Sequence, residues 1–211
     1  MNEVLPWYSV LSDMQAMTLW EALAVIFALL YLVLAMKQSR WCWIAAFAST
    51  SIYTVIFWHV ALLMESALNF YYIGMAMYGY WVWTQGGDEH KGIEITSLPW
   101  LTHGKIIAAT GIASIVVGYC MAHYTHAAFP YLDAATTCFA VVTTYLVAKK
   151  VLENWLYWVV IDLVSIYLYF SKGLMLTSLL FVFYVILAIA GFIAWTKRWR
   201  LKQLTDPVAL A

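Results

Sequence analysis

The chain has 211 residues, of which 65% are hydrophobic and 10% charged, and its formal net charge is zero. This proportion leaves too little polar surface to cover a water-soluble globule, so the composition predicts an integral membrane protein and excludes a basic, nucleic-acid-binding surface. The three cysteines show no CxxC spacing, and we expect no disulfide framework, no metal site and no cofactor.

Seven apolar runs meet or approach the length of about 20 residues that a helix needs to cross a bilayer. In chain order, they are Thr18–Met36, Trp41–Trp58, Ala61–Trp83, Gly104–Ala122, Tyr131–Ala148, Asn154–Phe170 and Leu174–Trp195. The sequence therefore predicts an all-α fold of seven transmembrane helices, in which residues 1–211 form a single transmembrane domain. The one substantial loop expected, Thr84–His103, separates three spans from four.

Positive charge is distributed unevenly between the two ends of the predicted spans. Ten of the eleven Lys and Arg residues fall in gaps on one side of the membrane, and Lys172 falls alone on the other. Because short cytoplasmic loops are enriched in Lys and Arg, we expect the N-terminus outside and the C-terminus in the cytoplasm. An odd number of spans also places the termini on opposite sides.

The first three spans are similar in sequence to the last three, in two slightly different registers. The first register matches the third span to the seventh, pairing Ser66 with Ser178, Leu68 with Leu180, Tyr72 with Tyr184, Ala76 with Ala188, Gly79 with Gly191 and Trp83 with Trp195. The second register matches the second span to the sixth and pairs Trp41 with Trp155. These matches predict two like-oriented three-helix repeats, residues 18–83 and 131–195, joined by a connector helix at 104–122.

The sixth span carries a polar and aromatic face. Its polar and aromatic residues recur at intervals of three or four, which places them on one side of a helix. They are Asn154, Trp158, Asp162, Ser165 and Tyr169. A carboxylate near the middle of a span costs roughly 2.5 to 3.5 kcal/mol on insertion scales, so it needs a protein-lined, hydrated or cationic environment. Asp162 therefore indicates the wall of a pathway. The alternative is a structural hydrogen bond from a tyrosine or a backbone donor.

Other acids lie nearer the ends of spans. Glu65 begins a stripe on the third span with Asn69 and Tyr72, and its alternative role is that of a snorkelling carboxylate at the interface. Asp133 and Glu21 head two further spans, where a carboxylate also stabilises a helix N-terminus. Aromatic walls with nearby acids suit a flat, cationic organic ligand, because rings present negative π faces. No group is arranged for catalysis, so we predict that the protein is not an enzyme.

Several motifs resemble those of the Pnu family of bacterial vitamin transporters. They are Lys149-Lys150, Glu153, Asn154, Trp155, Trp158, Asp162, Tyr167, Lys172-Gly173, Tyr78-Gly79, Trp81 and Trp83. The resemblance covers Glu21 to Trp195 and implies a three-plus-one-plus-three fold similar to that of SWEET sugar transporters, assembled as a homotrimer in the bacterial inner membrane. It also implies facilitated diffusion of an unphosphorylated B vitamin, which a cytoplasmic kinase then traps.

The same resemblance implies which residues contact substrate. Asn154 and Trp158 match the Asn-x3-Trp motif of the family, whereas Asn69 and Thr144 stand where its nicotinamide riboside branch, PnuC, has glutamines. This departure favours thiamine, carried by the PnuT branch, over the alternative, nicotinamide riboside. The expected set comprises, for substrate binding, Asn154, Trp158, Asp162, Tyr167, Asn69, Tyr72, Glu65 and Thr144, and, for an entrance or gate, Asp133, Glu21 and Lys172.

Two other classes of protein lack the residues that they require. A retinal photoreceptor needs a Schiff-base lysine in the last span, and Leu174–Trp195 contains none. A rhomboid-type intramembrane protease needs a serine in a Gly-x-Ser-x-Gly setting and a histidine at membrane depth, whereas all five histidines lie at or outside span ends. A membrane sensor or assembly subunit, which binds a ligand without transporting it, stays open as an alternative.

Overall fold

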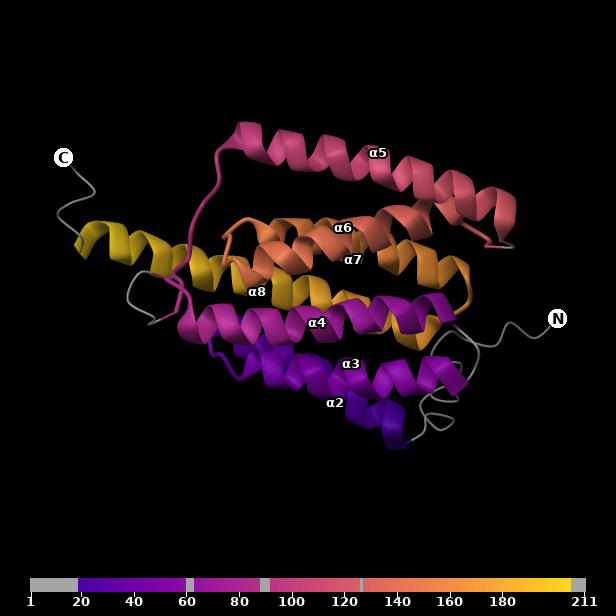
Figure 1. The fold of residues 1–211 in the computed structure, drawn as a ribbon, viewed down its shortest axis with the longest axis horizontal. Helices are drawn as coiled ribbons and strands as arrows, with labels where there is room; N and C mark the ends of the chain where they lie inside the picture. The colour runs from indigo at the N-terminus through magenta and orange to yellow at the C-terminus, as the bar shows by residue number, and fades with distance from the viewer. Residues whose placement is uncertain (1–18, 60–62, 88–91, 126, 206–211) are drawn as a thin grey trace.

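The computed structural model describes residues 19–59, 63–87, 92–125 and 127–205. These residues form seven α-helices (Figure 1): α2 (Leu19–Met36), α3 (Cys42–His59), α4 (Leu63–Gln85), α5 (Trp100–Tyr124), α6 (Pro130–Ala148), α7 (Asn154–Ser171) and α8 (Met175–Thr205). The all-helical prediction is confirmed. Six of the seven expected spans agree with a helix to within four residues at each end.

The seventh expected span differs, because α8 runs ten residues past the predicted end at Trp195. The added segment, 196–205, carries four basic residues. Lysine, arginine, leucine and glutamine all favour the helix, so the loss of apolar character ends the span without ending the helix. The basic residues of this extension therefore lie on a rigid element.

The helices differ in how apolar they are. By length and composition, α2, α5, α6 and α8 are each able to cross a membrane, and α3 contains a shorter apolar stretch, Cys42–Ile56. By contrast, α7 carries Asn154, Asp162 and Ser165, all of which are buried. A helix that turns polar side chains toward the protein interior does not present them to lipid, so its average hydropathy understates how well it tolerates the membrane.

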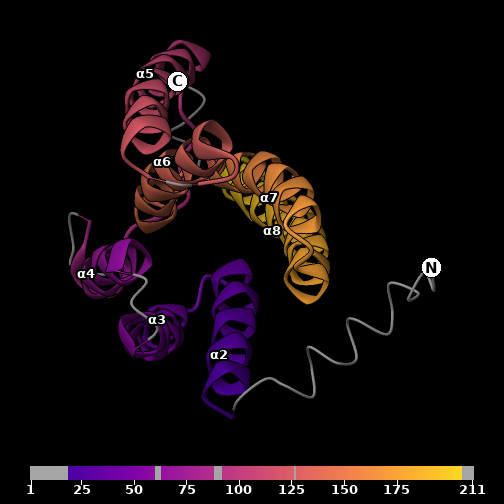
Figure 2. The ribbon, with the colours of Figure 1, turned by 90° about the vertical axis from the view of Figure 1, so that its right-hand side faces the viewer.

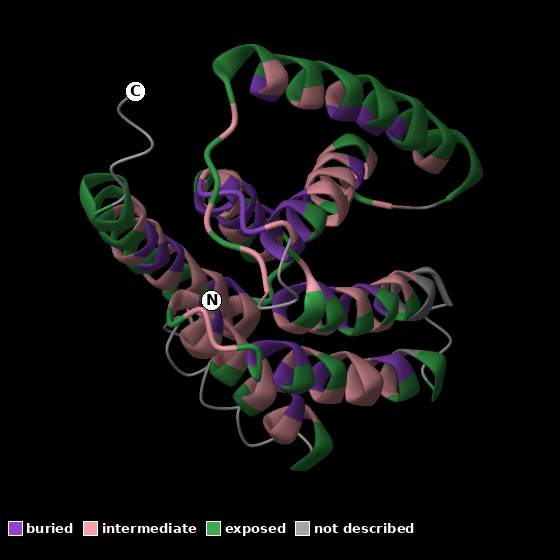
Figure 3. Cartoon of the chain, turned by 60° about the vertical axis from the view of Figure 1, so that its left-hand side comes forward, coloured by how far each residue is buried: buried purple, intermediate pink, exposed green. Residues whose placement is uncertain are grey.

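The helices form two groups of three, with α5 on the outside. Figure 2 shows α2, α3 and α4 in one group, α6, α7 and α8 in the other, and α5 beside α6. Among the described residues, the two groups contact each other through α4 with α6 and through α2 with α8. Buried residues follow the inward faces of the helices, whereas α5 is exposed along most of its length (Figure 3).

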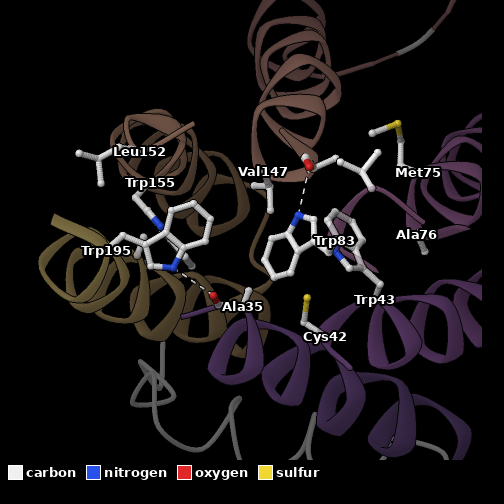
Figure 4. Packing of buried hydrophobic residues seen from close by; sticks show 13 residues of the cluster. Ala35, Cys42, Trp43, Met75, Ala76, Trp83, Val147, Leu152, Trp155 and Trp195 are labelled. Atoms are coloured by element: carbon white, nitrogen blue, oxygen red, sulfur yellow. Dashed lines mark hydrogen bonds between the residues drawn. The ribbon is translucent and has the colours of Figure 1, made fainter. Parts of the chain in front are cut away.

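Four buried tryptophans, Trp43, Trp83, Trp155 and Trp195, fill the core at one end of the bundle (Figure 4). We call them the tryptophan cluster and this end the cluster end. The rings of Trp43 and Trp83 meet edge to face with centroids 5.5 Å apart. Those of Trp155 and Trp195 meet in the same way at 5.4 Å. Since the Trp83 and Trp195 rings lie 6.2 Å apart, the cluster joins the two groups of helices.

Two hydrogen bonds tie the tryptophan cluster to helix ends across the group boundary (Figure 4). The indole N–H of Trp83, on α4, donates to the carbonyl O of Ala148, on α6, at 3.0 Å. The indole N–H of Trp195, on α8, donates to the carbonyl O of Ala35, on α2, at 3.1 Å. Both acceptors are carbonyls in the last turn of a helix, where intrahelical donors run out; the carbonyl O of Ala35 also accepts the backbone N–H of Gln38.

The tryptophan cluster corrects the expected match between the second and sixth spans. Trp43 packs on Trp83 as Trp155 packs on Trp195, and the first register, which aligns Trp83 with Trp195, also aligns Trp43 with Trp155. Trp41, which the second register pairs with Trp155, is instead 57% exposed. That pairing was wrong. The first register relates the tryptophan–tryptophan contacts in the two groups.

A short segment between α4 and α5, residues 92–99, crosses the cluster end, and we call it the strap. Thr96 forms a parallel bridge with Val151, in the turn between α6 and α7. The hydroxyl of Ser97 donates to the carboxylate of Glu153 at the end of the same turn. The strap is therefore fastened to the point where α7 begins.

Lys150 places a buried amine beneath the strap. Its Nζ donates to the carbonyl O of Ile93 at 2.8 Å and lies 4.6 Å from the centroid of the Trp83 ring. The pKa of Lys150 is lowered to about 8, chiefly because the amine is buried; Cys42 opposes this shift in part, and the nearby charge of Arg198 adds a smaller lowering. The folded protein therefore holds the Lys150 proton less tightly than the unfolded chain does.

The protein is expected to become more stable as pH rises from about 8 to about 10.5, the ordinary lysine pKa. Between these values the unfolded chain binds more protons, so raising the pH favours the folded state. Below pH 8 the penalty for charging Lys150 is present in full and is about 3 kcal/mol. Thermal unfolding in detergent micelles across this window measures the slope, which Lys150→Met should flatten. An identical slope in both proteins would contradict the prediction.

Candidate functional site

Asp162 is a buried carboxylate in the middle of α7. It is 4% exposed, and none of the described residues gives it a hydrogen bond or an ion pair. It lies eight residues after the first residue of α7, which corresponds to about 12 Å along the helix axis. A desolvated acid without a protein partner is energetically costly, so the position indicates a group kept for a ligand or for water.

One tyrosine near Asp162 connects it to the other group of helices. Tyr184, on α8, lies within electrostatic range of Asp162 and of Tyr53, on α3. Tyr53 in turn lies within electrostatic range of Glu21, on α2. Acidic and phenolic groups from four helices therefore face one region between the two groups.

Further rings continue this region toward α4. Tyr72 lies within electrostatic range of Tyr31 on α2 and of Tyr169 on α7. The Tyr169 ring stacks on Phe181 with centroids 5.2 Å apart, and Phe181 meets Tyr184 edge to face at 5.5 Å. The region beside Asp162 is thus lined with aromatic faces, which attract a flat cation.

Tyr31, Tyr53 and Tyr184 are not among the site residues that the sequence predicts. One signal pointed to Tyr184, because the first register pairs it with Tyr72, which was selected. Tyr31 and Tyr53 lie on helices without a buried charge near mid-span, so no polar pattern distinguished them. Only the packing of α2 and α3 against the other helices turns them toward this region.

Asn154 and Trp158 lie closer to the cluster end than Asp162 does. Asn154 is fully buried, its amide donates to the carbonyl O of Val151 at 2.6 Å, and its Oδ1 has no hydrogen-bond partner among the described residues. Trp158 is half-buried and packs against the core that contains the tryptophan cluster. These two residues of the expected motif therefore lie between the aromatic region and the closed cluster end.

Asn69 and Thr144 are both buried, at 8% and 7% exposure. The Thr144 hydroxyl donates to the carbonyl O of Ala140 at 2.8 Å, one turn back in α6, so it already has a partner. Its neighbour Thr143 is fully buried, and its hydroxyl has no partner among the described residues. Thr143 is thus a buried polar residue that was not predicted to bind substrate, although its neighbour Thr144 was.

Tyr167 does not join the group around Asp162. Tyr167 is 58% exposed, and its ring meets Phe129 edge to face at 6.4 Å. It follows Asp162 by five residues, which turns it to another side of the helix, so its expected role in binding is not supported by its position. The side chain of Glu65 lies outside the described residues.

Lys172 and Asp133 form an ion pair at the end opposite the tryptophan cluster. The Lys172 Nζ lies 2.9 Å and 3.1 Å from the two carboxylate oxygens of Asp133. Two of the residues expected at an entrance or gate are thus brought together, because the fold places the end of α7 beside the first turn of α6. Glu21, the third residue expected at an entrance, lies in the first turn of α2.

Breaking this ion pair should change stability little, because both side chains are partly exposed, at 28% and 21%. A double-mutant cycle with Asp133→Asn and Lys172→Gln, read by thermal unfolding, should give a coupling of about 0.2 to 1 kcal/mol. If the pair also restricts an entrance, the single variants should change the uptake rate beyond what their stability explains. Additive effects on both stability and uptake would contradict a pairing role.

A family model described as nicotinamide mononucleotide transporter matches residues 18–197 of this chain. The riboflavin/roseoflavin transporter RibM of Streptomyces davaonensis is 26% identical over 179 residues, which cover 83% of each chain. The nicotinamide riboside transporter PnuC of Escherichia coli is 21% identical over 207 residues, covering 85% of this chain and 86% of that one.

A crystal structure of the vitamin B3 transporter PnuC has the same fold. It superposes with a TM-score of 0.68 at 21% identity and covers 90% of this chain and 85% of its own. The relatives are transporters. This agrees with the prediction from the sequence that the protein is not an enzyme. Because the family model spans most of the chain, the protein belongs to the nicotinamide mononucleotide transporter family, the Pnu family of vitamin transporters.

Proposed function

We propose that this protein is a facilitative carrier for a flat, cationic, unphosphorylated vitamin, with nicotinamide riboside as its first candidate substrate. The observation that carries the proposal is Asp162, a buried carboxylate without a described protein partner beside a ring-lined region. A cationic ring placed there would offset the cost of the buried charge and stack on aromatic faces. No ion coupling is proposed.

Nicotinamide riboside replaces thiamine as the favoured substrate. The preference for thiamine came from the departures at Asn69 and Thr144, and the hydroxyl of Thr144 bonds its own helix, so that position says little about ribose recognition. The relatives PnuC and RibM are transporters of nicotinamide riboside and of riboflavin. Thiamine stays in the test because it is also a flat cation.

Riboflavin is the second candidate substrate, because RibM matches this chain at 26% identity over 83% of its length. Its ring system is flat and neutral, so it suits the aromatic faces but has no need of a carboxylate. Loss of uptake on removal of the Asp162 charge would favour a cation, whereas unchanged uptake would favour riboflavin.

The contacts between the helix groups support a rocking mechanism. The two groups meet along two narrow seams, α4 with α6 and α2 with α8, and the first register of the repeat maps one seam onto the other. We infer from this a three-plus-one-plus-three arrangement of SWEET type, in which the groups rock about a site between them. The tryptophan cluster closes one end in this conformation, leaving the other end as the route to Asp162.

The cluster end is proposed to face the cytoplasm of a bacterial inner membrane. The described basic residues near that end are Lys37, Arg40, Lys105, Lys149, Lys150, Lys197, Arg198, Arg200 and Lys202. Lys172 lies at the opposite end, and this asymmetry follows the positive-inside rule. We further propose a homotrimer and a cytoplasmic kinase that traps the vitamin.

Uptake of labelled nicotinamide riboside, thiamine and riboflavin into proteoliposomes tests the proposal. Saturable uptake of nicotinamide riboside, unaffected by ionophores and accelerated by unlabelled substrate on the far side, is expected of a passive carrier. Protein-free vesicles are the control. Binding of these vitamins without transmembrane flux would instead support the sensor or subunit alternative and would overturn the proposal.

A further inference from the structure

A cavity of about 280 Å³ opens at the cluster end, between the strap and the extension of α8. Pockets for small molecules begin at about 300 Å³, so this one is near the smallest useful size. Its polar and aromatic lining comprises Gln38, Glu94, Lys150, Arg198, Trp199 and Lys202. It lies outside the region around Asp162 and shares none of these lining residues with it.

The cavity carries an excess of positive charge. Three of its lining side chains are cationic and one is acidic, so its net charge is +2. Glu94, the acid, forms an ion pair with Lys202. Lys150 and Arg198 have no acidic partner among the described residues, and each repels the other, which is one reason for the low pKa of Lys150. A bound anion would relieve this repulsion.

Hydrogen-bond donors are also left over in the cavity. Lys150 uses one of its three N–H groups on the carbonyl O of Ile93, and it is only 7% exposed. Arg198 donates from Nη1 to the carbonyl O of Lys37 at 2.8 Å, which leaves other guanidinium N–H groups available. Guanidinium groups bind phosphate oxygens through paired N–H donors.

We propose that this cavity binds a small phosphate monoester that carries a flat ring. The phosphate would lie between Lys150 and Arg198, and the indole of Trp199 would form a wall for the ring. An unphosphorylated cation is disfavoured there by the positive charge. The site therefore selects against the substrate and for its phosphorylated form.

A ligand in this cavity would bridge the two groups of helices. Gln38 follows α2, in the first group, whereas Lys150 and Arg198 belong to the second. Trp199 packs against the core that contains the tryptophan cluster. Bound monoester would thus hold the cluster end closed. Given the proposed function, on which this step rests, the effect is product inhibition by the phosphorylated vitamin on the trapping side.

Calorimetric titration of the purified protein in dodecyl maltoside with nicotinamide mononucleotide tests the site without any transport. The wild type should bind it, and Arg198→Gln should weaken binding about tenfold or more, because a charge-assisted bond is lost. Glu94→Gln raises the net charge of the cavity and should tighten binding, which also provides a test if the arginine variant does not fold. The matched control, Lys197→Gln, removes a charge from the same helix outside this cavity and should leave binding unchanged.

Three results would overturn the assignment. One is no detectable binding to the wild type, and another is an equal loss in Lys197→Gln, which would indicate a diffuse charge effect. The third comes from nanodiscs: if phosphatidylglycerol raises the unfolding temperature through Arg198 and nicotinamide mononucleotide does not compete, a lipid headgroup occupies the cavity instead.

Transport measurements separate this inference from the proposed function. Nicotinamide mononucleotide enclosed in proteoliposomes should slow uptake of nicotinamide riboside in the wild type and not in Arg198→Gln. Unchanged uptake despite measured binding would overturn the inhibitory role. Binding of the monoester by a protein that transports no vitamin would overturn the proposed function and leave the anion site standing.

Discussion

Replacing Asp162 with asparagine is expected to lower uptake of a cationic vitamin about 10- to 100-fold, because the charge partner of a desolvated cation is lost. Asparagine keeps the shape of the side chain and removes only its charge. Folding stability should stay the same or rise, since the carboxylate is 4% exposed and has no described partner to lose. Proteoliposome uptake and thermal unfolding, measured on the same preparations, check both halves of the prediction.

Tyr167→Phe is the matched control for Asp162→Asn. Tyr167 lies on the same helix but is 58% exposed and turned away from the aromatic region, so its hydroxyl should be dispensable for uptake. A structural role for Asp162 predicts the opposite pattern, in which Asp162→Asn lowers the unfolding temperature and the uptake loss follows the loss of folded protein. That result would remove Asp162 from the binding site.

Gly79→Ala is expected to destabilise the fold by about 1 to 3 kcal/mol, the usual cost of overpacking a closed core. A Cβ at Gly79 would lie 2.3 Å from a ring carbon of Trp43, and one at Gly191 would lie 2.7 Å from Trp155. Both rings are held within the tryptophan cluster, so neither can move aside without disturbing its edge-to-face partner. Thermal unfolding followed by tryptophan fluorescence would report the loss at the cluster itself.

Gly74→Ala provides a matched control on the same helix. A Cβ at Gly74 meets no atom within 4 Å, so the substitution should be neutral or stabilising by up to about 1 kcal/mol through helix propensity. Gly191→Ala should resemble Gly79→Ala, because the two glycines occupy corresponding positions in the two groups of helices. Equal effects of Gly74→Ala and Gly79→Ala would mean that helix propensity, and not contact with Trp43, governs both.

Site residues divide into those that sequence reasoning could find and those that it could not. Asp162 was identified because a charge in the middle of an apolar span is conspicuous by itself. Tyr53 and Tyr184 were not selected, because a tyrosine in a membrane helix is equally compatible with an interface, a core or a site. The partner of Lys172 was missed because Asp133 lies 39 residues away along the chain, beyond the reach of any local pattern.

The register that relates the second span to the sixth could be assigned only from the tertiary structure. Trp41 and Trp43 are both tryptophans, so matching letters along the chain tolerates a slip from one to the other. Packing does not tolerate it, because only the indole of Trp43 lies against Gly79. Burial, at 1% for Trp43 and 57% for Trp41, separates two residues that the sequence treats alike.

The sequence by itself determined that the protein is a bundle of membrane helices, where six of the seven helices begin and end, and which carboxylate lies at mid-span. These properties follow from local hydropathy, which acts on each segment separately. The tertiary structure alone decided which tryptophans close the cluster end, which tyrosines face Asp162 and how the strap and α8 enclose a basic cavity. Those outcomes depend on contacts between segments far apart in the chain, where shape and burial decide among residues of equal hydropathy.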